Sequence, residues 1–251
     1  MRCNWLCAAL LCLPLGIVAQ NAPPAGTIIP ISLDTSLNAA KIHSGQMIRA
    51  TVMQDVPGTA IHRRAKVEGR VIKVGATTNG QMKMVIRFDA VKIDGQMVPI
   101  RTDLRAMASF MEVEEAKVPE EMSSRGMTPE TWTTQQIGGD QVYRGGGPVA
   151  DGLTTVGEVT PWGALDVPRA QPGQPCRGEV GDNAQPQAMW LFSSDVCGVY
   201  GFSNIDIKHA GRSDPAGTIV LTSTNGKLNL GSGTGMLLRV TSPAAMPRSR
   251  S

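Results

Sequence analysis

Apolar and polar side chains alternate with a period of two along much of the first half of the chain. Ile48, Ala50 and Val52 alternate with more polar residues, and a second run alternates over residues 82–88. A period of two places every second side chain on the same face of a strand. We therefore predict half-buried strands with their apolar faces turned toward a core.

The second run changes phase after Phe88, because the next apolar positions, Val91 and Ile93, have odd numbers. A slip of one residue inside a strand is what a β-bulge at Asp89–Ala90 would produce. The dipeptide Asp94–Gly95 then predicts a tight hairpin turn, since both residue types tolerate positive φ. A bent strand followed by a tight turn favours a small closed barrel.

The alternation dissolves after about residue 111 and returns near residue 189. Residues 112–187 contain clustered glutamates, a run of three glycines and a Pro-rich stretch, which predicts a long irregular linker. Farther on, Asn225–Gly226 predicts a two-residue hairpin turn that sets Leu221 opposite Leu230. The predicted fold class is all-β, in five segments: a signal peptide at 1–19, a β-barrel-like module at 26–111, the linker at 112–187, an antiparallel β domain at 188–241 and a disordered tail at 242–251.

The first residues have the three parts of a cleavable secretory signal. A single basic residue, Arg2, precedes an apolar run over residues 6–18, and the small residue Ala19 comes before a polar, Pro-rich segment. The run is too short for a bilayer-spanning helix and is broken by Pro14 and Gly16. We expect cleavage after Ala19 and export to the periplasm, the cell envelope or the medium, with no transmembrane segment in the mature chain.

Two cysteines, Cys176 and Cys197, follow the predicted signal. An even pair in an oxidising compartment predicts a disulfide. A metal site is disfavoured because the three histidines are scattered and none forms a short-range ligand pair with either cysteine. We expect no metal and no cofactor.

Charge is divided unevenly along the chain. Residues 27–111 hold 12 Lys and Arg against 6 Asp and Glu, whereas residues 112–251 hold 11 against 15. The densest basic run contains His62, Arg63, Arg64 and Lys66. Guanidinium groups match phosphate oxygens, so this run is a candidate site for an anionic glycan or lipid. The alternative is an ordinary exposed turn. Aromatic residues are scarce, so we expect no nucleic-acid partner.

The N-terminal module resembles part of a known barrel through the order of its glycine and apolar positions. The Ser44–Gly45–Gln46 turn precedes a strand, Ile61 leads into Val67-Glu68-Gly69-Arg70-Val71, and Ile93-Asp94-Gly95 follows Phe88. This order is similar to the β-barrel of the outer-membrane channel component of type IV secretion and conjugation systems, over about a third of the chain. The family usually has Pro and Gly where His62 and Arg64 stand here. The resemblance implies a barrel fold and an envelope location.

No catalytic motif stands out. The chain has no nucleophile elbow, zinc-protease helix motif or phosphate-binding loop. The clustered carboxylates Asp195, Asp206 and Asp214 are the candidates for an envelope-polymer hydrolase. We predict instead a non-catalytic envelope protein with a structural or binding role. Another protein of the envelope is a further candidate partner, beside the anionic glycan or lipid. An accessory component of a secretion or conjugation system is a second alternative.

Overall fold

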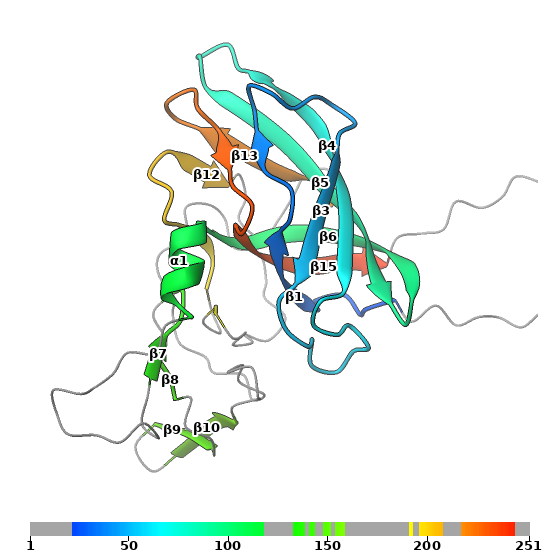
Figure 1. Ribbon diagram of the computed structural model, residues 1–251, viewed down its shortest axis with the longest axis vertical. Coiled ribbons are helices and arrows are strands. Elements are labelled where there is room, and N and C mark those ends of the chain that lie inside the picture. The colour runs from blue at the N-terminus through cyan, green and yellow to red at the C-terminus, as the bar shows by residue number, and fades with distance from the viewer. Residues whose placement is uncertain are drawn as a thin grey trace, which may run out of the picture.

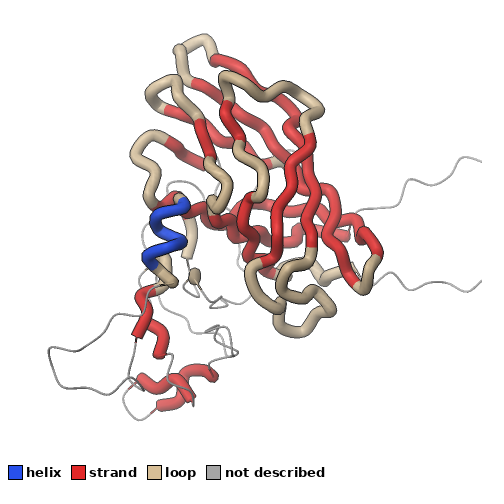
Figure 2. Tube along the Cα trace, viewed as in Figure 1, coloured by secondary structure: helices blue, strands red, loops and turns tan. Residues whose placement is uncertain are grey.

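The computed structural model describes residues 22–117, 133–138, 141–143, 148–151, 154–158, 191–192, 196–207 and 217–243. Regular structure in this part of the chain is almost entirely β, with one short helix (Figure 2). The all-β fold class predicted from the sequence is therefore confirmed. The predicted signal peptide, residues 1–19, lies outside the described residues, as does most of the predicted linker and the tail from residue 244.

Six antiparallel strands close into a barrel (Figure 1). Their order around the barrel is β6, β15, β1, β3, β4 and β5, and pairing between β5 and β6 closes the ring. The six strands are β1 (Ile28–Leu33), β3 (Met47–Val52), β4 (Lys66–Ala76), β5 (Met82–Ile93), β6 (Gln96–Ala108) and β15 (Gly235–Pro243).

Shorter elements extend this framework. The barrel sheet also includes β11 (Gly198–Tyr200) beside β6, and β13 (Ile219–Ser223) and β12 (Ile205–Ile207) beyond β5. The remaining elements are three two-stranded pairs and a helix: β2 (Leu37–Asn38) with β14 (Asn229–Leu230), β7 (Thr133–Gln135) with β8 (Gln141–Tyr143), β9 (Pro148–Asp151) with β10 (Thr154–Glu158), and α1 (Phe110–Glu115).

The predicted bulge and tight turn are both present. Glu68 pairs with Ala90 while the next residue of β4, Gly69, pairs with Phe88, which leaves Asp89 as the extra residue of β5. Asp94 and Gly95 have φ values of 47° and 82° and join β5 to β6 by a two-residue turn. The phase change in the sequence therefore located the bulge in β5 correctly.

The hairpin predicted at Asn225–Gly226 is wrong. The chain does turn there, but β13 pairs with β5 and β12, while β14 pairs with β2. Side chains replace the expected ladder: Asn225 Oδ1 accepts from the Lys227 backbone N–H at 3.0 Å, and Ser223 Oγ donates to the Lys227 carbonyl at 2.7 Å. The backbone groups of Lys227 therefore need no partner across a hairpin.

The sequence predicted a barrel-like module within residues 26–111. In the structure the ring of strands closes only when β15 is included. This strand comes from the predicted C-terminal domain, and it pairs with β1 on one side and β6 on the other. Strands from the two predicted modules therefore share one sheet and one interior core, in which Ile31, Ile48, Val71 and Ile86 pack with Leu238. Alternation identifies strands but not their distant partners, which is why the sequence left these segments apart.

The outer surface of the β1–β15–β6 wall is covered by a second core. There Ile28, Ala106 and Leu237 pack with Val113 of α1 and Phe192. The sequence did not predict helix α1. Its N-cap is Ser109, whose side chain accepts a hydrogen bond from the Glu112 backbone N–H. The helix packs closely against β15 because Gly235 of that strand faces Val113. A Cβ on residue 235 would lie 2.8 Å from Val113 Cγ2.

Arg105 contributes a polar contact to this covered side. It is the extra residue where the register of β6 shifts against β15, and its side chain is fully buried. Arg105 Nε donates to the Val196 carbonyl at 2.8 Å. The bond links the barrel wall to the segment that precedes β11.

Within the described part of the chain, no helix has the length and apolar character needed to cross a bilayer.

Candidate functional site: the basic outer face

The wall formed by β3, β4 and β5 differs from the covered wall because its outward side chains are exposed or half-buried. In Figure 1, α1 lies to the left of the barrel and strands β3 and β4 to the right. We define the basic face by the charged outward side chains of this wall. Seven are basic and two are acidic: Arg49, Lys66, Arg70, Lys73, Lys83, Arg87, Lys92, Glu68 and Asp89.

The centre of the basic face is a pair of arginines that share one carboxylate. Arg70 and Arg87 are directly opposite each other on β4 and β5. Arg70 Nε lies 2.7 Å from Asp89 Oδ2, and Arg87 Nε lies 2.5 Å from Asp89 Oδ1. The bulge places Asp89 on the outward side, next to Arg87. One carboxylate between two guanidinium groups leaves the cluster with one net positive charge.

The contacts with Asp89 use only the Nε atoms. Within the described residues neither guanidinium makes another hydrogen bond or ion pair, so the Nη groups keep their donors for a ligand. The side chains of Arg70 and Arg87 are 53% and 39% exposed, and that of Asp89 is 25% exposed. Two planar forks whose positions are fixed by a shared anion are well suited to an oxyanion, because little rotamer freedom remains to be lost on binding.

Two exposed apolar side chains lie beside the arginine pair. Met47 is directly opposite Arg70 on the β3 side and is 51% exposed. Ile72, two residues beyond Arg70, is the extra residue at a second register shift in β4 and is 37% exposed. The row across the wall is therefore Met47, Arg70 and Arg87.

The basic run predicted as an anion site lies beside a carboxylate, Asp55. His62 Nδ1 lies 3.6 Å from Asp55 Oδ1, and the same oxygen accepts from the Arg63 backbone N–H at 2.7 Å. Arg64 is exposed and adopts a positive φ of 69°. The run therefore forms a turn beside Asp55, and its role in binding an anion stays a prediction.

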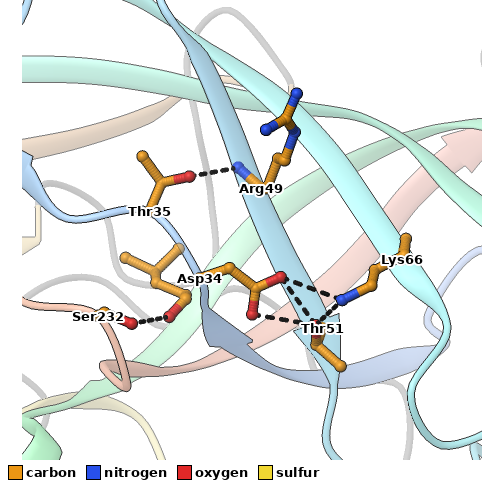
Figure 3. Close-up of polar contacts among 7 residues, drawn as sticks. Asp34, Thr35, Arg49, Thr51, Lys66 and Ser232 are labelled. Carbon is orange, nitrogen blue, oxygen red and sulfur yellow. Dashed lines mark hydrogen bonds and ion pairs between the residues drawn. The ribbon is translucent and has the colours of Figure 1, made fainter.

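Lys66, the last residue of that run, is already paired. Its Nζ donates to Asp34 Oδ2 at 3.3 Å and to Thr51 Oγ1 at 2.8 Å (Figure 3). Thr51 Oγ1 in turn donates to both oxygens of Asp34. Figure 3 also shows the Arg49 backbone N–H donating to Thr35 Oγ1 beside this cluster. These bonds fix the end of β1 against β3 and β4 and reduce the positive charge that Lys66 can offer.

An open hollow of about 600 Å³ lies next to the same turn. Small and apolar residues line it, together with one histidine: Ala22, Pro23, Pro24, Gly58, Thr59, Ala60 and His62. His62 is the one titratable side chain among these lining residues.

The other sequence candidates are only partly within the described residues. Asp206 lies on β12 opposite Thr222, while Asp195 and Asp214 lie outside the described residues. Cys197 is buried just before β11, and Cys176 lies outside the described residues, so the disulfide stays a prediction. In the described ranges no three His, Cys, Asp or Glu side chains gather in a way that could hold a metal ion.

Sequence reasoning missed Arg70, Arg87 and Asp89 as a site. The signal was available in part, because the alternation places both arginines on outward positions and the predicted bulge lies at Asp89. Comparison with known proteins finds no matching family model, no matching curated protein and no matching solved structure.

Proposed function

We propose that this chain is a non-catalytic exported protein of the cell envelope that binds an anionic component through the basic face. The observation that supports it is the Arg70–Arg87 pair, whose Nε atoms are held by Asp89 while both side chains remain partly exposed. The excess of basic side chains on this wall attracts an anionic partner over a range set by ionic strength.

The test is salt elution from phosphocellulose and from heparin. Arg70→Ala/Arg87→Ala should elute at clearly lower salt than the parent protein, because it loses both forks. The matched control, Arg63→Gln/Arg64→Gly, removes an equal number of positive charges, two, from the predicted basic run. Glycine at residue 64 also allows the positive φ found there. This control should shift elution less. Equal shifts would mean that only net charge matters, and no retention of the parent protein would contradict the proposal.

Export rests on the N-terminal pattern and has its own test. Mass spectrometry of the protein recovered from the envelope or the medium should find an N-terminus at Gln20, created by cleavage after Ala19. A mature pool that begins at Met1 would contradict export by this signal.

One observation favours the second candidate, an accessory role in a secretion or conjugation system. Arg64 takes φ 69° at the position where the channel family usually has Gly, so the turn keeps a conformation suited to that residue. This role predicts that the protein copurifies with channel subunits from detergent-solubilised envelopes. Recovery of the protein without any channel subunit would count against it.

A further inference from the structure

The geometry of the basic face points to the phosphate groups of an anionic phospholipid bilayer as its partner. This inference rests on the proposed function and deepens it: Arg70 and Arg87 bind one headgroup phosphate, and the surrounding wall of β3, β4 and β5 lies against the membrane surface. Three features of the face support it.

The first feature is the fixed arginine pair. A phosphodiester presents two non-bridging oxygens that share one negative charge, and a guanidinium fork can donate two parallel hydrogen bonds to such oxygens. Arg70 and Arg87 come from opposite positions on neighbouring strands, so both forks can reach one headgroup. Asp89 neutralises only one of the two, and the remaining charge balances that of one phosphodiester.

The second feature is the spread of positive charge around the pair. Lys73, Lys83 and Lys92 lie on outward positions of β4 and β5, on both sides of the arginine row along the strands. Their charges extend over a surface and are not concentrated in a pocket. Each basic side chain near an anionic membrane surface contributes attraction, so a broad face gains more from a bilayer than from a single small anion.

The third feature separates a bilayer from a soluble acidic polymer. Met47 and Ile72 are exposed beside the arginine pair, and Met97 is exposed directly opposite Lys92 near the other end of β5. Apolar side chains on a basic face gain nothing from a hydrated glycan chain. They gain free energy when they reach below the headgroups of a bilayer, where binding grows with the apolar area buried.

The test uses flotation with vesicles of phosphatidylcholine that contain increasing fractions of phosphatidylglycerol. The full chain should bind vesicles with phosphatidylglycerol and not vesicles of phosphatidylcholine alone. Arg70→Ala/Arg87→Ala should lower the partition coefficient roughly 30-fold, from about a fivefold loss for each arginine. Circular dichroism of this variant should match the parent protein, because both arginine side chains are at least partly exposed.

Two further variants separate the parts of the site. Arg70→Lys/Arg87→Lys keeps the charge but removes the forks, so its loss should fall between the parent and the alanine variant. Met47→Ser should weaken vesicle binding while leaving elution from phosphocellulose unchanged. The control Lys117→Ala removes one basic charge outside the basic face, just beyond the end of α1, where Lys117 pairs with Glu114. This variant should partition close to the parent protein.

The outcomes distinguish the two proposals. Retention on heparin or phosphocellulose without any binding to phosphatidylglycerol vesicles would overturn the bilayer inference and leave the proposed anion-binding function standing. Loss of retention on every anionic matrix would overturn both. Vesicle binding that Arg70→Ala/Arg87→Ala does not reduce would overturn the assignment to this pair.

Discussion

Gly69 has no room for a side chain, which makes it the sharpest point at which to test the barrel. A Cβ built on Gly69 would lie 2.2 Å from the Arg87 carbonyl oxygen and 3.0 Å from both Cα and Cδ1 of Phe88. Two of these atoms belong to the backbone of β5 beside the bulge, so the strand itself would have to move by about 1 Å. A rotamer change alone cannot relieve the contact.

Gly69→Ala should therefore destabilise the protein. Forcing one extra carbon into a packed wall costs about 1–3 kcal/mol, and the reduced entropy of the unfolded chain offsets only about 0.4–1 kcal/mol of this. Gly75→Ala is the matched control, because it lies on the same strand with no atom within 4 Å of the added Cβ. It should raise stability by about 0.4–1 kcal/mol.

Thermal and urea unfolding followed by circular dichroism will measure the difference. For a chain of this size each kcal/mol corresponds to about 2–4 °C in Tm, so the two alanine variants should melt several degrees apart. Equal melting temperatures for Gly69→Ala and Gly75→Ala would refute the packing of Gly69 against β5, and with it the register at the bulge.

Three other predictions concern α1, β6 and the two cysteines. Partial burial, with a smaller contribution from a neighbouring glutamate, raises the pKa of Glu112 above its usual value. The folded state then holds that proton more strongly than the unfolded chain, so stability falls as pH rises through the ordinary and then the raised pKa. Glu112→Gln should remove this part of the fall in urea titrations between acidic and neutral pH, and an unchanged pH dependence would contradict it. Arg105→Met removes the hydrogen bond to the Val196 carbonyl and leaves that oxygen buried, which should cost about 1–3 kcal/mol in urea unfolding; a variant as stable as the parent protein would show that the bond contributes nothing. Non-reducing peptide mapping of the purified protein should find Cys176 linked to Cys197, whereas two alkylatable thiols would rule the disulfide out.

Local features of the fold could be predicted from the sequence, and distant ones could not. The bulge at Asp89 and the turn at Asp94–Gly95 depend on residues a few positions apart, and both were predicted correctly. The turn at Asn225–Gly226 also forms, but its flanking strands find partners far along the chain. Helix α1 was missed because its short sequence lies within an acidic cluster, and its position depends on packing against Gly235.

The candidate site followed the same division. Charge density along the sequence indicated residues 62–66, but density ignores which side chains already have acidic partners. Lys66 pairs with Asp34, and that contact joins positions 32 residues apart. Arg70 and Arg87 become a pair only once the register of β4 against β5 is known, because 17 positions separate them and the bulge decides where Asp89 points.

The place of β15 between β1 and β6 has a consequence for how this protein matures. Ser232, just before β15, bonds to Leu33 at the end of β1, across 199 positions of the chain. A ribosome must therefore release the chain through Pro243 before the ring can shut, and contacts so distant in sequence form slowly. Until then the nascent protein lacks its finished barrel, and the apolar inner faces of β1 and β6 stay without this partner strand.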